Sequence, residues 1–146
     1  MYRLELGTDT LGNAGKNFIT NRAKGLITMT TIVLASQSTS RRRLLESAGL
    51  FPKIIVSQVD EETEFFNSLS PSDMVIALAI TKAHTVREQI DFPAIIIGCD
   101  STFEFDGQSL GKPGSPEIAT ERAKRVRGNS GLLHTGHCII DTAKDI

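Results

Sequence analysis

Two patterns alternate along the chain: short apolar runs, and longer segments whose apolar residues recur every three or four positions. The runs are rich in β-branched residues and predict buried strands. The periodic segments predict amphipathic helices. We expect strands at residues 32–35, 54–56 and 94–97, and helices from Ser38 or Ser40 to about residue 48, from residue 70 to about 89, and from residue 115 to Gly128.

The segments between these elements complete the expected order. Residues 59–66 are acidic and predict a loop, and Asp106-Gly107 predicts a type I′ turn in a hairpin. Apolar residues at 132–133 and 138–140 indicate a final strand or strand pair. Because strands alternate with helices, the expected fold class is α/β, with a mixed, twisted sheet flanked by helices.

Length and composition favour one globular domain at residues 29–146. The chain has 146 residues, of which 40% are hydrophobic and 23% charged. These values suit a single domain with its own core. Residues 1–28 show neither the two-residue period of a strand nor the 3.6-residue period of a helix, so we expect a poorly ordered leader there. Met29 is an alternative start of the natural protein.

Charge and hydropathy exclude several classes of protein. A net charge of −1 excludes a strongly basic nucleic-acid binder, and no apolar run reaches the roughly 18 residues of a membrane span. The two cysteines, Cys99 and Cys138, are too few for a disulfide scaffold. We therefore expect free thiols, a cytoplasmic location, and neither nucleic acid nor a membrane as a partner.

The first candidate for chemistry is the turn at residues 36–43, which contains three serines and three arginines. Arginines in the first turn of a helix are locally unfavourable, because the helix dipole is positive there. An anion bound by Ser36, Ser38, Arg41 and Arg42, together with backbone N–H groups, would remove this conflict. Phosphate is the anion that we expect, and a solvated basic helix face is the alternative.

Two lysines could add positive charge to a phosphate site. Lys82 falls on the apolar stripe of the second predicted helix, where a lysine either extends to solvent or points at an anion. Lys112 is presented by a Gly-Lys-Pro loop, which lacks the glycine spacing of a Walker A motif. The alternative for Lys112 is a merely solvated side chain.

An acidic residue follows the third apolar run. Asp100 is expected at the carboxyl end of that strand, where open α/β sheets place their ligands. A carboxylate there can bind a divalent cation or accept a proton from water, and capping of a turn is the alternative. One acid among residues 60–64 would complete a Mg²⁺ site with Asp100 and substrate phosphates. The combination favours metal-assisted attack of water on a phosphoanhydride.

The order and spacing of these residues resemble the Maf family of nucleoside triphosphate pyrophosphatases, over about residues 32–141. The resemblance rests on the motifs Leu34-Ala35-Ser36-x-Ser38-x-x-Arg41, Val59-Asp60-Glu61, Leu78-Ala79-x-x-Lys82-Ala83, Gly98-x-Asp100, Gly111-Lys112-Pro113 and Thr135-Gly136. It implies a Maf fold, related to inosine triphosphate pyrophosphatase. It also implies hydrolysis of a nucleoside triphosphate to the monophosphate and pyrophosphate with a divalent metal, Mg²⁺ or Mn²⁺.

The same resemblance implies roles for individual residues. Asp100 corresponds to the acid that accepts a proton from water, and Glu61 to an acid associated with metal and catalysis, so both are the expected metal ligands. Lys82 completes the expected catalytic set and corresponds to a position that holds phosphate. The remaining phosphate-binding residues are expected to be Ser36, Ser38, Arg41, Arg42 and Lys112. The implied biological role is removal of non-standard or excess nucleotides.

Length and one substrate position separate this chain from the family pattern. Family members continue well past Thr135-Gly136, so we expect the C-terminal part of the fold to be missing after Ile146. Ser101 stands where substrate choice varies, which leaves the preferred base open. Two alternatives to an active enzyme follow: a nucleotide-binding remnant without turnover, and a regulator of septum formation that acts through a partner. The expected ligand is a nucleoside triphosphate, and a homodimer stays open.

Overall fold

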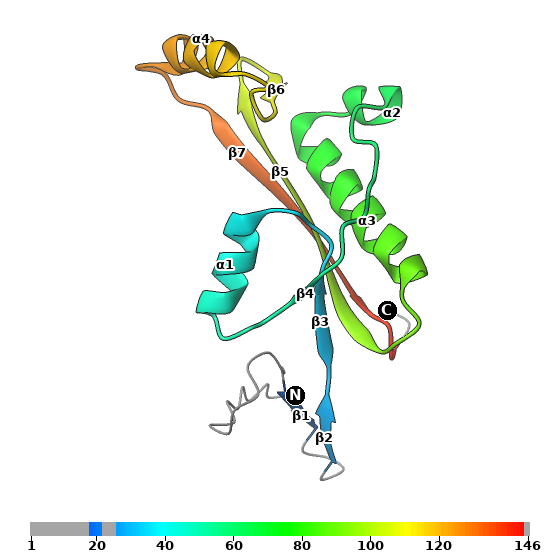
Figure 1. Ribbon diagram of the computed structural model, residues 1–146. Helices are drawn as coiled ribbons and strands as arrows, with labels where there is room; N and C mark the ends of the chain where they lie inside the picture. Colours follow the sequence, from blue (N-terminus) through cyan, green and yellow to red (C-terminus); the bar gives the residue numbers. More distant parts are fainter. Residues whose placement is uncertain (1–17, 22–25, 145–146) are drawn as a thin grey trace.

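The computed structural model describes residues 18–21 and 26–144, which form two sheets (Figure 1). The smaller sheet is an antiparallel pair, β1 (Phe18–Asn21) with β2 (Leu26–Met29). These strands fall in the segment expected to be a poorly ordered leader, whose residues 1–17 and 22–25 lie outside the described part. Only Thr30 separates β2 from the first strand of the larger sheet.

The larger sheet has five strands in the order β4-β3-β5-β6, and β7 pairs with β5 as well. The strands are β3 (Thr31–Leu34), β4 (Lys53–Ile54), β5 (Ala94–Phe105), β6 (Gln108–Leu110) and β7 (Leu132–Asp141). β3 runs parallel to β4 and β5, whereas β6 and β7 run antiparallel to β5. The predicted mixed α/β sheet is confirmed. Positive φ angles at Asp106 (51°) and Gly107 (71°) confirm the predicted hairpin turn.

Four helices connect the strands in the described part of the chain. They are α1 (Thr39–Ser47), α2 (Glu64–Asn67), α3 (Pro71–Gln89) and α4 (Pro116–Val126). The long helices begin as the sequence predicts, because Ser38, Ser70 and Ser115 each accept a backbone N–H of the first turn. The prediction of a loop at residues 59–66 is wrong for its last three residues, because Thr63 caps the short helix α2 that begins at Glu64.

The lengths of the strands differ most from the sequence prediction. The strand expected at residues 54–56 is β4, which ends at Ile54. The strand expected to end at residue 97 continues to Phe105, because β7 pairs with β5 from Ile95 to Glu104. A partner strand whose paired residues lie 28 or more positions later in the chain extends β5, and no local pattern reveals that partner.

The main core lies between α3 and the β5–β7 pair (Figure 1). Glycine at two positions permits the close approach of the helix. A Cβ atom at Gly98 on β5 would overlap the carbonyl oxygen of Ala79, and one at Gly136 on β7 would overlap that of Val75. Protein interiors are close-packed, so this contact fixes the position of α3 along the sheet.

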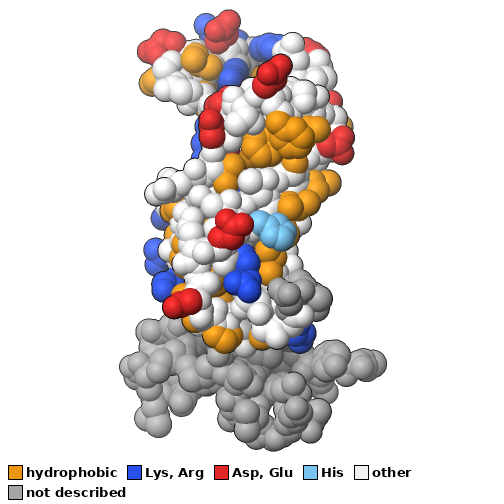
Figure 2. Space-filling model, turned by 90° about the vertical axis from the view of Figure 1, so that its right-hand side faces the viewer, with side chains coloured by type: hydrophobic (Ala, Val, Ile, Leu, Met, Phe, Trp, Pro, Cys, Tyr) orange, Lys and Arg blue, Asp and Glu red, His pale blue; other side chains and the backbone are white. Residues whose placement is uncertain are grey.

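The opposite face of α3 remains at the surface. Exposed apolar side chains on α2 and α3 include Phe65, Ile76 and Ile80. Figure 2 shows apolar side chains gathered in the upper part of this side of the molecule. No helix within residues 26–144 is both long enough and apolar enough to cross a membrane.

One edge of β5 lacks a strand partner in its middle. β3 pairs with residues 94–97 and β6 with residues 103–105, so residues 98–102 have no strand beside them on that edge in the described structure. The gap begins where β3 ends, because Leu34 pairs with Ile97. Asp100 therefore lies in the middle of a long strand, beside the carboxyl end of its neighbour. This corrects the prediction that its own strand ends before it.

Candidate active site

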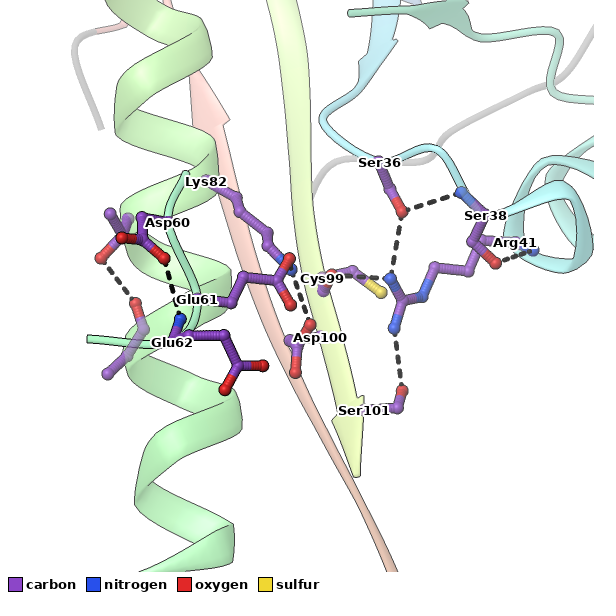
Figure 3. Close-up of polar contacts among 12 residues, drawn as sticks. Ser36, Ser38, Arg41, Asp60, Glu61, Glu62, Lys82, Cys99, Asp100 and Ser101 are labelled. Carbon is purple, nitrogen blue, oxygen red and sulfur yellow. Dashed lines mark hydrogen bonds and ion pairs between the residues drawn. The ribbon is translucent and has the colours of Figure 1, made fainter. Parts of the chain in front are cut away.

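A cleft of about 870 Å³ opens at the gap beside β5. It is lined by the turn after β3, by the segment that precedes α2, and by parts of α3, β5 and the β6–α4 region. Both sides of β5 contribute, because successive side chains of a strand point to opposite faces. Figure 3 shows Asp100 toward α3 on one side, and Arg41 with Ser101 on the other.

Lys82 is at the centre of the α3 side of the cleft. Its ammonium Nζ lies 2.6 Å from Asp100 Oδ1 and 2.7 Å from Glu61 Oε1 (Figure 3). The lysine side chain is only 8% exposed, so it turns inward from the apolar stripe of α3 instead of extending to solvent. The structure thus brings together Glu61, Lys82 and Asp100, the three residues predicted as the catalytic set.

Glu61 and Asp100 are also the residues that could hold a divalent cation. Their carboxylates lie near each other, because one oxygen of each contacts Lys82 Nζ. Within the described part of the chain, no three or more His, Cys, Asp or Glu side chains are grouped so as to hold a metal by themselves. Two carboxylates fit Mg²⁺ or Mn²⁺ when substrate phosphates and water complete the coordination, which is the common mode for Mg²⁺.

Arg41 is at the centre of the other side of the cleft. Its Nη1 donates to Ser36 Oγ at 3.1 Å and to the carbonyl oxygen of Cys99 at 2.8 Å, and its Nη2 donates to Ser101 Oγ at 3.0 Å. Ser101 Oγ in turn lies 3.0 Å from Thr135 Oγ1. These bonds hold the guanidinium at the open edge of β5. Among the described residues they leave Nε and one N–H of Nη2 for a ligand.

Ser36 and Ser38 shape the turn that carries Arg41. Ser36 Oγ accepts the backbone N–H of Ser38 at 3.2 Å as well as the Arg41 guanidinium. Ser38 Oγ accepts the backbone N–H of Arg41 at 3.3 Å and so caps α1. Since Ser36 Oγ already accepts two hydrogen bonds, its own proton is available to an anion in the cleft.

Arg42 points away from these residues. Its Nε lies 2.7 Å from Glu46 Oε1 on the exposed surface of α1. It is not among the residues that line the cleft. The predicted contact of Arg42 with phosphate stays a prediction, and no contact of its side chain with a residue of the cleft supports it in the described structure.

The β6–α4 region forms the remaining wall of the cleft. Lys112, in the exposed loop between β6 and α4, lines the cleft. Arg122 on α4 lines it too, and its Nη1 donates to the carbonyl oxygen of Gly111. The sequence does not single out Arg122, because α4 also carries Lys124 and Arg125, and no pattern separates one cation from another.

Thr135 supports the site in a way that only strand pairing reveals. It lies directly opposite Ser101 in the β5–β7 register, so the two hydroxyls meet beside Arg41. The sequence marks Thr135 as part of a Thr-Gly motif, but it contains no sign of this partner. The motif's glycine, Gly136, lies opposite Asp100 and leaves room for α3.

Both cysteines are free, as predicted. Burial raises the pKa of the Cys99 thiol above its ordinary value of 9.0, and the nearby Arg41 opposes that effect. Burial also raises the pKa of the Cys138 thiol. Both thiols are therefore protonated at neutral pH, and neither is a ready nucleophile.

Comparisons with known proteins agree with this architecture. The sequence profile of the family described as "Maf-like protein" matches residues 31–146. A protein named nucleoside triphosphate pyrophosphatase from Streptomyces coelicolor is 49% identical over 113 residues, which cover 77% of this chain and 54% of that protein. One of the same name from Prochlorococcus marinus is 46% identical over 109 residues, or 75% of this chain and 58% of that protein.

A more distant relative shows the same coverage. A Mycobacterium protein, also named nucleoside triphosphate pyrophosphatase, is 39% identical over 118 residues, which cover 76% of this chain and 56% of that protein. The chain thus spans about half the length of the curated relatives that it matches. The profile match covers every strand of the larger sheet and the whole cleft. On this evidence, the chain belongs to the Maf family.

Proposed function

We propose that the cleft binds a nucleoside triphosphate and hydrolyses it to the monophosphate and pyrophosphate. The observation that carries this proposal is the buried Lys82, whose Nζ contacts Glu61 and Asp100 beside a rim that contains Arg41 and Lys112. Such a site offers carboxylates for a metal and a proton, and cations for a polyphosphate. The names of the relatives support the same reaction.

In the proposed reaction, water attacks the α-phosphorus and its oxygen forms the new bond. The bond from the α-phosphorus to the bridging oxygen breaks, and pyrophosphate leaves with the electron pair. Asp100 takes the proton of the water. Its Oδ1 is bonded to Lys82, and Oδ2 has no hydrogen-bond partner among the described residues, so Oδ2 can accept that proton.

The other polar residues bind and orient the triphosphate. Lys82 holds the Asp100 carboxylate in place from the buried side. Arg41 offers its remaining N–H groups, Ser36 its hydroxyl proton, and Lys112 its ammonium to the phosphate oxygens. These groups offset the negative charge that builds up on the leaving pyrophosphate.

A divalent cation fits the same site when the substrate is bound. Glu61 and Asp100 would hold it together with phosphate oxygens, since both carboxylates lie in the cleft beside Lys82. When bound, Mg²⁺ or Mn²⁺ would act as a Lewis acid toward the phosphoryl oxygens.

The proposal extends to the biological setting. Removal of non-standard nucleotides in the cytoplasm would be the role of such an activity, and the two free thiols suit a reducing compartment. The partner remains a nucleoside triphosphate, and a homodimer stays a prediction.

The test is release of pyrophosphate from a panel of canonical and modified nucleoside triphosphates with Mg²⁺ or Mn²⁺. It compares the 146-residue chain with Asp100→Asn and with Asp91→Asn, which changes an exposed aspartate outside the cleft. We expect Asp100→Asn to lower turnover by about 10²–10⁴-fold, the usual contribution of a general base, and to retain binding. Asp91→Asn should behave as the parent chain.

Other outcomes select the alternatives. Binding of nucleotide without release, in a folded parent chain, would identify a nucleotide-binding remnant. Cell-division phenotypes that survive Asp100→Asn would identify a regulator that acts through a partner. Equal turnover by the parent chain and Asp100→Asn would remove Asp100 from the reaction.

A further inference from the structure

We propose that Arg122 is a positioning residue of the cleft, which holds the Gly111–Lys112 loop so that Lys112 faces the triphosphate. This inference rests on the proposed triphosphate ligand. It adds a residue outside the catalytic set, and it assigns a task to α4, the helix farthest along the chain.

The hydrogen bond of Arg122 is the first observation. Its Nη1 donates to the carbonyl oxygen of Gly111, the residue directly before Lys112. Among the described residues, it is the one hydrogen bond that joins residues 111–114 to another part of the chain. Gly111 itself has open space around it, since a Cβ there would meet no atom within 4 Å. The loop therefore depends on Arg122 for its position.

The second observation is that α4 is only weakly anchored, so the hydrogen bond from Arg122 to Gly111 is one of few contacts that fix the helix and the loop relative to each other in the described structure. α4 has no buried residue. α4 is also tied by Arg125, whose Nη2 lies 3.3 Å from Asp106 Oδ2 and 3.4 Å from Gln108 Oε1, and whose guanidinium lies over the Phe105 ring. Arg125 thus ties α4 to the hairpin of β5 and β6, whereas Arg122 ties it to the cleft. One arginine holds the helix, and the other holds the loop.

The geometry of an arginine suits this task. A guanidinium carries five N–H donors in a rigid fork, and a carbonyl acceptor takes one of them. The positive charge of Arg122 also lies beside the loop whose lysine must reach an anion. Arg122 and Lys112 both line the cleft, so a hydrogen bond from Arg122 to the residue before Lys112 helps to set where the Lys112 ammonium lies.

The experiment measures binding of inorganic tripolyphosphate by isothermal titration calorimetry, with the 146-residue chain. The variants are Arg122→Ala, Lys112→Ala, the double variant, and Lys124→Ala. Lys124→Ala is the matched control, because it removes one positive charge from an exposed position of α4 that does not line the cleft. Circular dichroism and urea midpoints check that each variant is folded.

We expect Arg122→Ala to weaken binding by about five- to tenfold, the usual effect of one hydrogen bond. In the Lys112→Ala background, the same change should cost less than about twofold, because a positioning residue acts through the group that it positions. Lys124→Ala should change affinity by less than about twofold. With a substrate that turns over, Arg122→Ala should raise KM and also lower kcat, because Lys112 offsets charge on the leaving pyrophosphate, and in the Lys112→Ala background both changes should nearly disappear.

Three results would overturn the inference. Equal affinities of Arg122→Ala and the parent chain would mean that the loop needs no such support. Additive losses in the double variant would mean that Arg122 contacts the phosphate directly. Absence of tripolyphosphate binding by the folded parent chain would reject both this inference and the proposed phosphate site. Tripolyphosphate binding without pyrophosphate release from any nucleotide would instead reject the proposed reaction and leave the role of Arg122 standing.

Discussion

The two sides of β5 build the cleft in different ways. On the side of α3, Lys82 is buried and contacts Glu61 and Asp100, which come from segments 21 and 18 residues away in the chain. On the side of α1, Arg41 is held by Ser36 from its own turn and by Cys99 and Ser101 of β5. The position of Lys82 thus depends on how α3 packs against the sheet, whereas the position of Arg41 depends on the turn that caps α1.

The helices on the two sides of the cleft also differ in how many of their residues are buried. α3 has six buried residues, including Lys82, whereas α1 has none. A charge that is packed under a helix cannot move to water when its partner is lost, whereas a half-buried guanidinium such as that of Arg41 can. We therefore expect mutations on the α3 side to change stability, and mutations on the α1 side to change ligand binding.

The largest effect should come from Lys82→Met, which breaks the α3 side. It leaves Glu61 and Asp100 without the ammonium between them, and Asp100 is only 12% exposed. Removing one partner of a buried ionic group should lower the free energy of unfolding by on the order of 3 kcal/mol. Urea denaturation measures it, with the exposed Lys124→Met as control. A loss equal to that of the control would mean that the contacts of Lys82 with Glu61 and Asp100 do not stabilise the fold.

Gly98→Ala should have the next largest effect, because it pushes α3 from the sheet. The new Cβ would overlap the carbonyl oxygen of Ala79 and lie 2.8 Å from Ala83 Cβ. Overpacking of this kind costs about 1–3 kcal/mol of unfolding free energy. Gly114→Ala serves as the control, since its Cβ would meet no atom within 4 Å. If both variants unfold at the same urea concentration, α3 is free to shift along β5.

On the α1 side, Arg41 and Arg42 sharpen the comparison because they are neighbours with different contacts. Arg41→Ala removes hydrogen bonds at the cleft and should weaken tripolyphosphate binding by about tenfold. Arg42→Ala removes only an exposed pair with Glu46, so affinity should change by less than about twofold. Calorimetric titration separates them. Equal losses would mean that general positive charge, and not the position at β5, attracts the anion.

The smallest effect concerns pH. The folded-state pKa of the Cys99 thiol is raised by burial above 9.0, so folding favours the protonated thiol. Its contribution to stability is therefore complete below pH 9 and is lost as the pH rises through the folded pKa. Cys99→Ala should lose less stability than the parent chain between pH 8 and pH 10, as followed by urea midpoints. A larger loss in Cys99→Ala would contradict the raised pKa.

The helices follow closely from the sequence, but the strands do not. Ser38, Ser70 and Ser115 mark the helix starts correctly, because a capping hydroxyl bonds to a backbone N–H three residues later. Gly49, directly after the C-cap of α1, has a positive φ of 78°, the left-handed conformation in which a glycine commonly ends a helix. The length of β5 and the position of Asp100 within it depend on pairing with β7, which comes from the end of the chain. The ends of a strand depend on the strands that pair with it, which can come from anywhere in the chain. A helix cap depends only on residues that are adjacent in the sequence.

The candidate site divides along the same line. The sequence by itself determined that serines and arginines share a turn before a helix, that Lys82 lies on an apolar stripe, and that an acid follows a buried run. It could not reveal which of those charges meet. That Lys82 contacts both Glu61 and Asp100, that Arg42 points away while Arg41 lies at β5, and that Arg122 holds the Gly111 loop depend on the packing of α3 and α4. Only the tertiary structure decided these contacts, because a side chain's partner across the fold is chosen by the elements that pack around it, and local spacing carries no record of them.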